Sequence, residues 1–393
     1  MTRRGNGKTL AFALLWVMQA LLYSLSAAGL HSFADNSVLS SGKWVRIAVS
    51  SSGVYKITYE NLKQWGISDP SRPRVFGYGG AKLSEDFSDA KVDDLPQLSV
   101  WMEKGADGVF NAGDYILFYA QGPVSWKYDA AGLFTHTLNP YSDYGYYFVT
   151  SDAGTDKLIN DNVQASLSDV PSKTVTSFMD YSVYEEETTN LLASGQRWFG
   201  EVFSNSSVHD FDFSFPNIRK DSAMKVVVSM ASGATASTTA VLSHGAQSFT
   251  SNLSAKSSSL TASDNTLMAS FTPSDDDFTL GLKFNGSSYG SAWLDYIEVC
   301  AYRNLVMSGS YMQFREPSVT GASAVGYSLA GSDLVVWDMT NPADVKYVQT
   351  SYSAGKYSFV ADASALREYV AVKPSAYFPA PTFVEEVANQ NLH

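Results

Sequence analysis

Short runs of alternating β-branched and aromatic residues recur along the chain, with turn residues between them. In KWVRIAV (residues 43–49), Trp44, Arg46 and Ala48 fall on one side, and two valines and an isoleucine fall on the other. This period of two is the pattern of a β-strand with one buried face. Strand-like runs at intervals of roughly 8–15 residues, bounded by Gly, Pro, Asn and Asp, are typical of sandwiches and barrels. The sequence therefore predicts an all-β chain with two consecutive β-sandwich regions and a few short helices.

Two local elements near the start of this pattern can be predicted individually. A Ser-Ser-Gly turn separates the first run from GVYKITY, so residues 43–59 are expected to form a hairpin. A short helix is expected over Tyr59–Trp65, where good helix formers are followed by Gly66.

The first residues have the three-part layout of a secretory signal peptide. Arg3, Arg4 and Lys8 precede an apolar run from Leu10 to Leu22, and small residues follow it. The run is short for a membrane span of about 20 residues. Removal of residues 1–34 would leave 24 basic and 39 acidic residues, because three of the 27 basic residues and none of the acidic ones lie there. We expect an acidic, exported protein without a transmembrane span in its mature part.

Charge and cysteine content exclude several classes of function. The formal net charge is −12, whereas a protein that binds nucleic acid through phosphate contacts is normally basic. One cysteine cannot form an intramolecular disulfide framework or a multi-cysteine metal site. An exported chain with one unpaired cysteine fits the bacterial envelope better than a disulfide-rich eukaryotic secretory protein.

A change of composition near Asp152 suggests how the chain is divided. A polar stretch poor in aromatic residues begins there, and strand-like runs resume beyond it. A later block, Asp333–Lys373, is expected to complete the second sandwich. We predict a signal peptide over residues 1–34, an N-terminal β domain over 35–160, a second β-sandwich domain over 161–378 and a linker over 379–393.

The residues offer little sign of nucleophilic catalysis. Cys300 lies inside a strand pattern, and a catalytic thiol needs a histidine base and a lowered pKa. There is no G-x-S-x-G motif, and the stretch HTLNPYSDYG that begins at His136 has the composition of a turn. The other histidines outside residues 1–34 are His209, His244 and His393, and none lies in a local motif. We predict that Cys300 is a buried, inert thiol.

Acidic and aromatic clusters leave alternatives open. Asp107, Asn111 and Asp114 have the oxygen ligands that calcium prefers, but a hydrogen-bonded turn explains them equally. Two acidic runs, at residues 185–187 and 275–277, are expected to be solvated surface, and nothing selects a glycosidase pair from 39 acidic residues. A tyrosine cluster is either a ligand platform or strand packing; it consists of Tyr141, Tyr144, Tyr146 and Tyr147. We assign no catalytic, cofactor-binding or metal-binding residue, and no cofactor.

Nine stretches of the chain, in order, resemble one protein family. They are GKWVRIAVSSSGVYKITYENLKQWGI, RVFGYGGA, DDLPQLSVWM, DGVFNAGDYILFYAQGPVSW, HTLNPYSDYGYYFVT, SGQRWFGEVF, WLDYIEVCAYRNL, VVWDMTNPADV and PTFVEEVANQNLH. Together they resemble the N-terminal region of the sortases of the type IX secretion system, which are gingipain-family cysteine peptidases of Bacteroidetes. Each motif is weak alone, but nine in order span nearly all of the chain after the signal peptide.

The resemblance implies a function that this chain would serve only in part. Members of the family carry propeptide-like β-sandwich regions before a caspase-like domain with the catalytic histidine and cysteine. They remove the C-terminal export signal of cargo proteins at the outer membrane. VANQNLH resembles the junction before the catalytic domain, so no catalytic residue can be transferred to this chain. The implied partners are cargo proteins and other secretion-system components, at the periplasm, outer membrane or cell surface. The alternative is a self-standing envelope module, either an adhesin or a carbohydrate-binding sandwich.

Overall fold

The computed structural model describes residues 34–391, except residues 87, 90, 91, 192, 194 and 287–289. Apart from Ala34, the predicted signal peptide lies outside the described residues. The described chain forms two compact units, one of residues 34–42, 84–95 and 388–391, and one of residues 43–83 and 96–387. In the first unit, the 3₁₀ helix η1 (Val38–Ser40) is held from both sides. Its Val38 N–H donates to Asp94 Oδ2 (2.5 Å), and Gln390 N–H donates to the carbonyl of Leu39 (3.0 Å).

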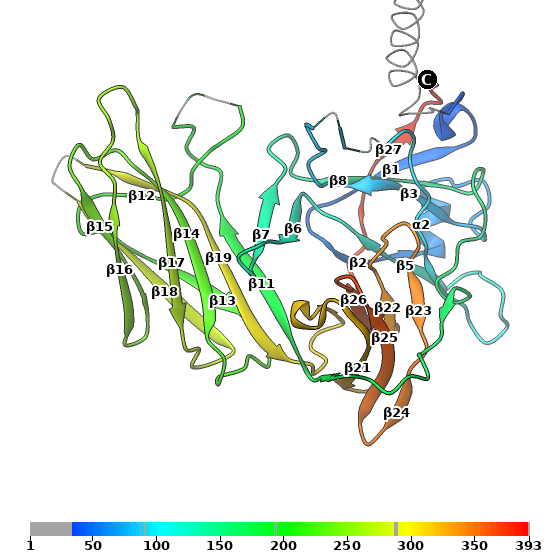
Figure 1. The fold of residues 1–393 in the computed structure, drawn as a ribbon. Helices are drawn as coiled ribbons and strands as arrows, with labels where there is room; N and C mark the ends of the chain where they lie inside the picture. Colours follow the sequence, from blue (N-terminus) through cyan, green and yellow to red (C-terminus); the bar gives the residue numbers. More distant parts are fainter. Residues whose placement is uncertain are drawn as a thin grey trace, which may run out of the picture. The chain divides into compact units, whose positions relative to one another are not determined.

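The regular secondary structure of the second unit consists almost entirely of strands, which confirms the prediction of an all-β fold (Figure 1). One sheet has the order β27 (Thr382–Val387), β1 (Trp44–Val49), β8 (Gly145–Thr150), β3 (Arg74–Gly79). A second sheet has the order β2 (Gly53–Thr58), β5 (Tyr115–Ala120), β4 (Trp101–Glu103). Side chains of both sheets share one core, which includes Val45, Ile47, Ile57, Ile116 and Phe118.

The predicted hairpin over residues 43–59 is wrong. Strand β1 pairs with β8 and β27, whereas β2 pairs with β5 in the other sheet. The alternating pattern identified β1 and β2 as strands, but it does not specify the pairing partner. The predicted helix is confirmed as α2 (Tyr59–Gln64), and a reciprocal capping box between Thr58 and Asn61 begins it.

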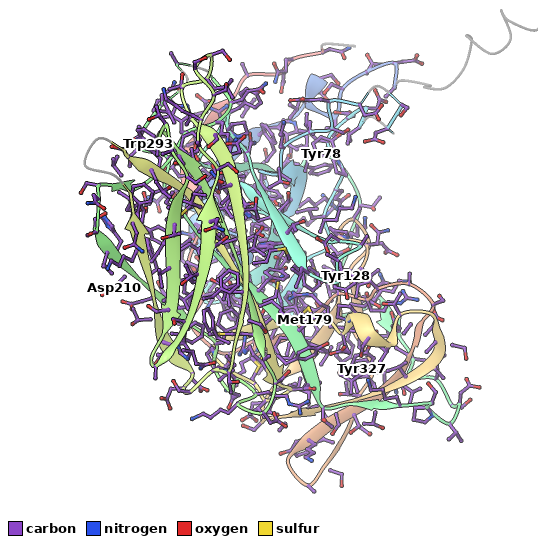
Figure 2. All side chains as sticks on the ribbon, turned by 60° about the vertical axis from the view of Figure 1, so that its left-hand side comes forward. Tyr78, Tyr128, Met179, Asp210, Trp293 and Tyr327 are labelled. Carbon is purple, nitrogen blue, oxygen red and sulfur yellow. The ribbon has the colours of Figure 1, made fainter. Side chains whose placement is uncertain are left out.

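A β-sandwich occupies the middle of the chain. One sheet has the order β11 (Ser177–Glu185), β19 (Ala292–Asn304), β14 (Met224–Ser232), β17 (Ser263–Phe271), with β12 (Val202–Phe203) on β19. The facing sheet has the order β13 (Val208–Ser214), β18 (Asp277–Asn285), β15 (Thr238–His244), β16 (Gln247–Leu253). Strand β18 alternates strictly, because Phe278, Leu280, Leu282 and Phe284 point into the core. Strand β13 alternates in a similar way, and polar Asp210 is one of its outward-facing residues (Figure 2).

The block Asp333–Lys373 differs from its prediction. Its strands belong to two sheets. One has the order β20 (Tyr311–Phe314), β26 (Tyr369–Val372), β22 (Val335–Asp338), β23 (Lys346–Val348), β9 (Val163–Gln164). The other has the order β10 (Thr174–Val175), β21 (Ala322–Ala330), β25 (Lys356–Ala363), β24 (Ser351–Ser353). The two sheets share a core of their own, which includes Phe314, Tyr327, Phe359 and Tyr369, instead of completing the second sandwich. The predicted domain borders themselves stay a prediction.

The segment predicted as a linker contains strand β27. This strand pairs antiparallel with β1 over five residue pairs. Two salt bridges accompany the pairing, Arg46–Glu385 (2.9 Å) and Lys43–Glu386 (3.2 Å). Pro379 and Pro381 made the segment look like a linker, but both lie before the strand, and the strand itself is a largely solvent-exposed sheet edge.

Candidate functional site

A hairpin joins the first pair of sheets to the central sandwich. It consists of β6 (Val124–Tyr128) and β7 (Phe134–Leu138), with Trp126 opposite His136. Its turn is closed by Asp129, whose N–H donates to the carbonyl of Leu133 (2.8 Å) and whose Oδ1 accepts from the N–H of Leu133 (2.9 Å). The turn predicted in HTLNPYSDYG is present at residues 140–144, but His136 itself lies within β7 and not in the turn.

The hairpin packs on strands β11 and β19 through aromatic side chains. Trp126 stacks on Tyr181 of β11, with ring centroids 4.2 Å apart. Phe134 also contacts the Tyr181 ring, at 4.9 Å between centroids. Tyr128 and Met179, both labelled in Figure 2, belong to the same apolar cluster. The hairpin is therefore seated on the sandwich by burial of aromatic surface.

His136 lies between two glutamates at this contact. Its Nδ1 is 2.6 Å from Glu298 Oε1, and its Nε2 is 3.0 Å from Glu185 Oε2. The side chains of His136 and Glu298 are 4% and 3% exposed, and that of Glu185 is 12% exposed. Ionised carboxylates only accept hydrogen bonds, so the contacts with both require both ring nitrogens to carry protons. The imidazole is therefore held as an imidazolium.

The pKa of His136 reflects opposing effects. Burial lowers it, but hydrogen bonds and charge from Glu185 and Glu298 outweigh burial and raise it to about 9. His136 N–H also donates to Glu298 Oε1 (2.7 Å), so the backbone of β7 is fixed to the same carboxylate. The expectation that Glu185 is solvated is wrong, because the hairpin covers it.

A pocket of about 220 Å³ opens beside the imidazolium. Glu187 lines it, and burial together with the charges of Glu185 and Asp295 raises the pKa of Glu187 to about 7. Arg197 lies opposite, with Nη2 at 2.9 Å from Asp295 Oδ2. Asp295 Oδ2 also accepts a hydrogen bond from Ser229 Oγ (2.8 Å). The pocket thus contains groups able to exchange protons near neutral pH.

No thiol nucleophile serves this pocket. Cys300 is buried as predicted, and its Sγ donates to the carbonyl of Phe134 (3.5 Å). Burial, only partly offset by that hydrogen bond, raises the pKa of the Cys300 thiol to about 11. Reactive cysteines have lowered pKa values, so Cys300 has the character of a packing residue.

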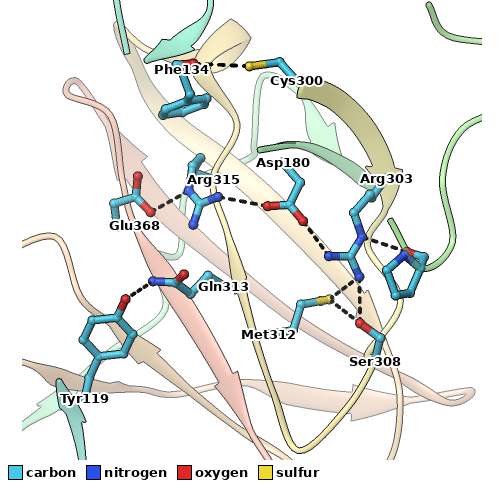
Figure 3. A network of polar contacts seen from close by, with 11 residues as sticks. Tyr119, Phe134, Asp180, Cys300, Arg303, Ser308, Met312, Gln313, Arg315 and Glu368 are labelled. Carbon is cyan, nitrogen blue, oxygen red and sulfur yellow. Dashed lines mark hydrogen bonds and ion pairs between the residues drawn. The ribbon is translucent and has the colours of Figure 1, made fainter. Parts of the chain in front are cut away.

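A second ionic network lies next to the hairpin (Figure 3). The guanidinium of Arg315, which is fully buried, stands between two carboxylates: Nε is 2.6 Å from Glu368 Oε2, and Nη1 is 3.4 Å from Asp180 Oδ1. Arg303 Nη1 contacts the other Asp180 oxygen at 2.6 Å. The Arg315 guanidinium also stacks on Tyr181, 4.4 Å from the ring centroid. Through Asp180 and Arg303, this network connects β11 and β19 of the sandwich with Glu368, which lies in the loop before β26.

A groove of about 530 Å³ runs beside this network. Its lining contains three aromatic residues, Tyr119, Trp126 and Tyr181, among a larger number of polar ones that include Gln121, Gln313 and Glu368. Gln313 Nε2 donates to the hydroxyl of Tyr119, which places an amide and a phenol side by side in its wall. Aromatic faces with a few polar groups are typical of ligand sites.

The other predicted clusters have local roles. Asp114 accepts hydrogen bonds from the N–H groups of Gly105 (2.9 Å) and Asn111 (2.8 Å), and Asp107 accepts from Val109 N–H and Asn111 Nδ2. The carboxylates thus close a turn. Among the described residues, no group of three or more His, Cys, Asp or Glu side chains is arranged to hold a metal ion.

The remaining acidic and tyrosine clusters are divided between surface and structure. Asp276 accepts from the N–H groups of Asn217 and Ile218, so one member of the run 275–277 fixes a neighbouring loop. Of the four tyrosines, Tyr147 is buried and its hydroxyl accepts from Gln121 N–H (2.6 Å). The other three are exposed: Tyr141, Tyr144 and Tyr146. They do not line the groove described above.

Sequence reasoning missed the two ionic networks. His136, Glu185 and Glu298 lie on three strands far apart in the chain. Asp180 is likewise more than 120 positions from its partners Arg303 and Arg315. The one available signal was a charged residue at an otherwise apolar strand position, such as Glu298 in WLDYIEVCAYR. Within the described part of the chain, no helix has both the length and the apolar character needed to cross a bilayer.

Comparison with known proteins relates this fold to one solved structure. No protein-family model and no curated protein matches the chain. Dimeric latent PorU from Porphyromonas gingivalis matches with a TM-score of 0.80 and 29% identity, over 91% of this chain and 34% of the PorU chain. The chain therefore spans about a third of the length of PorU.

Other matches are too distant to support an argument. The CBM36-1 domain of a xylanase from the hindgut metagenome of Trinervitermes trinervoides has a TM-score of 0.23 at 12% identity, over 30% of this chain and 96% of its own. The insecticidal delta-endotoxin Cry8Ea1 from Bacillus thuringiensis has a TM-score of 0.24 at 10% identity, over 71% of this chain and 55% of its own.

The match to PorU confirms the predicted relationship at the level of the whole β region. In fold and in sequence, this chain is PorU-like.

Proposed function

We propose that this chain is the non-catalytic part of a type IX secretion system sortase, a gingipain-like cysteine endopeptidase. The similarity to PorU over 91% of the chain is the observation that carries the proposal. The peptidase chemistry, thiolate attack on a peptide carbonyl with a histidine as acid and base, would be performed by a caspase-like domain beyond the described residues. The β regions would position that domain and its cargo.

The ionic networks give this role a physical basis. Positioning a catalytic domain requires that its support does not flex, and misplacement by about 1 Å can cost a hundredfold in rate. Here His136 fixes the hairpin to the sandwich, and Arg315 fixes the sandwich to the region around Glu368. The His136 network is largely shielded from water, and in the second network the Arg315 guanidinium is buried, so these contacts are stronger than exposed ion pairs.

The proposed partners and location follow from the same relationship. The partners would be cargo proteins with C-terminal export signals and other secretion-system components. The chain would be exported and would reside in the periplasm, the outer membrane or the cell surface of a Gram-negative bacterium. N-terminal sequencing of the mature protein from fractionated cells tests this location, and a mature protein that still begins at Met1 in the cytoplasm would contradict it.

A domain exchange tests the function. The matching third of Porphyromonas gingivalis PorU is replaced by this chain in cells without their own PorU, and removal of export signals from cargo is followed by mass spectrometry. We expect processing to be retained. An exchange protein that carries Arg315→Met should process less cargo. One that carries the surface change Arg219→Met should process as much cargo as the unmodified exchange protein. A folded, exported exchange protein without any processing would overturn the proposal.

An assay of the chain alone tests the claim that it is non-catalytic. The purified chain is incubated with peptides that contain an export-signal cleavage site, at pH 6 to 9. We expect no turnover. Turnover that disappears in Cys300→Ser would show that the chain is itself a peptidase.

The groove supports a second candidate function, a self-standing carbohydrate-binding module. Its volume of about 530 Å³ and its Trp126 and Tyr181 rings suit a saccharide. Isothermal titration with xylotriose, maltotriose and N-acetylglucosamine oligomers tests this alternative. Saturable binding, together with failure of the domain exchange, would favour it over the sortase part.

A further inference from the structure

A compact pocket with an unusual charge lies at the start of strand β3, away from the two networks. Three chain segments frame it. They are joined by the hydrogen bonds Leu98 N–H to the carbonyl of Val75 (2.8 Å) and Val100 N–H to the carbonyl of Lys157 (3.0 Å). Its volume is about 100 Å³, the liquid volume of about three water molecules, so it has room for one small group.

Four cationic side chains line this pocket: Arg72, Arg74, Lys104 and Lys157. The only carboxylate among the lining residues is Asp156, which is engaged by Arg74 Nη2 at 2.9 Å. The lining therefore carries three positive charges more than negative ones. This excess stands out in a chain whose formal net charge is −12.

The arginine at the base of the pocket is fixed and incompletely bonded. The Arg74 side chain is only 4% exposed, and its Nη1 donates to the carbonyl of Ser151 (2.9 Å). Its Nε is buried, and the described residues give it no hydrogen-bond acceptor. A buried donor without an acceptor is costly, so a ligand oxygen at this position would be stabilised.

The remaining cations are available to a ligand. Lys157 Nζ donates to the carbonyls of Gln97 (3.1 Å) and Ala343, which hold it in place without neutralising it. Within the described chain, the side chains of Arg72 and Lys104 make no hydrogen bond or ion pair, and both residues are exposed. Apolar residues complete the lining: Leu98, Val100, Met102 and Leu158. Such a wall lowers the local dielectric and strengthens attraction to an anion.

We propose that this pocket binds a phosphate group, either as the free ion or as part of a larger phosphate-bearing molecule. A dianion matches the excess of positive charge better than a carboxylate does. Arginine and lysine together offer the directed and the point-charge contacts that phosphate oxygens accept. The site is independent of the proposed sortase role, because it uses none of the residues of the two ionic networks.

Isothermal titration with inorganic phosphate at constant ionic strength tests the site. We expect saturable binding of one phosphate per chain, weakened at least tenfold in Arg72→Gln/Lys104→Gln. These side chains are exposed and unbonded, so the variant should fold normally, which circular dichroism and thermal unfolding verify. Lys225→Gln/Lys356→Gln is the matched control, because it removes the same charge from exposed strand positions elsewhere. It should bind phosphate like the unmodified chain.

Further measurements distinguish the sources of the phosphate. Co-sedimentation with phosphatidic acid vesicles, compared with phosphatidylcholine vesicles, tests a lipid-borne group. Vesicle binding that the pocket variant loses and the control keeps would identify a lipid phosphate, whereas binding of the free ion alone would identify a soluble one. The proposal is overturned if neither probe binds, if the control variant loses binding equally, or if acetate binds as tightly as phosphate.

Discussion

His136 Nδ1 and Glu298 Oε1 lie 2.6 Å apart, although 162 positions separate the two residues in the chain. The contact joins the hairpin β6–β7 to strand β19, and Glu185 completes it from β11. A charged histidine between two carboxylates is well stabilised only while all three groups are ionised. The attachment of the hairpin therefore depends on pH.

The stability of the protein should fall as the pH rises from 6.5 to 9. The pKa of His136 is about 9 in the folded chain, against an ordinary value of 6.5 for histidine, so its contribution is complete below pH 6.5 and is lost by pH 9. The shift corresponds to a contribution on the order of 3 kcal/mol. Urea unfolding at pH 6, 7, 8 and 9 measures it. The slope should disappear in His136→Gln and persist in His209→Gln; a slope unchanged in His136→Gln would contradict the assignment.

Removal of the Arg315 guanidinium should destabilise the protein. Arg315→Met leaves Glu368 without its partner, while Asp180 keeps Arg303, and the Glu368 side chain is 35% exposed. The loss should therefore lie below the about 3–5 kcal/mol of breaking a fully buried pair, but above that of a surface pair. Arg219→Met removes an exposed pair with Asp221 and should cost about 1 kcal/mol or less. Denaturant unfolding of both variants provides the comparison. Equal losses would show that the buried network contributes no more than a surface ion pair.

The Cys300 thiol should be protected in the native protein. With a pKa of about 11, about 0.1% of it would be thiolate at pH 8, and the side chain is buried in addition. We expect slow labelling by a disulfide reagent in buffer and fast labelling in denaturant. The exposed variant Ser257→Cys in a Cys300→Ala background is the control for reagent access. Equally rapid labelling of native Cys300 would indicate an open, reactive site.

Glu187→Gln should stabilise the protein at pH 8 and have little effect at pH 4. The pKa of Glu187 is raised to about 7, so its ionisation between pH 4.5 and 7 costs more in the folded chain than in the unfolded chain. The gain should be small, because burial of Glu187 is only partial and the water that still reaches the side chain screens the effect. Thermal unfolding at both pH values measures the difference, with Glu186→Gln as the control. A loss of stability at pH 8 would mean that ionised Glu187 is favourably paired.

Individual strands were predictable, whereas their partners were not. The alternation in KWVRIAV correctly identified β1 as a strand, because successive side chains of a strand point to opposite faces with a period of two. The expected hairpin failed because β1 and β2 bury their apolar faces in the same core from opposite sheets. A local pattern is compatible with either arrangement.

The candidate sites were even less accessible from the sequence. Cys300 was correctly placed in a buried strand, since apolar neighbours flank it. Glu185 begins the acidic run 185–187 and was therefore expected to be solvated surface. Packing of the hairpin on β11 and β19 instead places His136 between Glu185 and Glu298, and this contact raises the pKa of His136.

The sequence by itself determined the all-β fold, the position of most strands, the helix at residues 59–64 and the relationship to PorU. These properties depend on residues close together in the chain or on the order of whole motifs. Tertiary structure alone decided which strands share a sheet, which charges are buried and where cationic side chains gather around a pocket. Those outcomes depend on contacts between residues more than 40 positions apart, as in Arg74–Asp156 and His136–Glu298. Their energies arise only when folding excludes water from both partners.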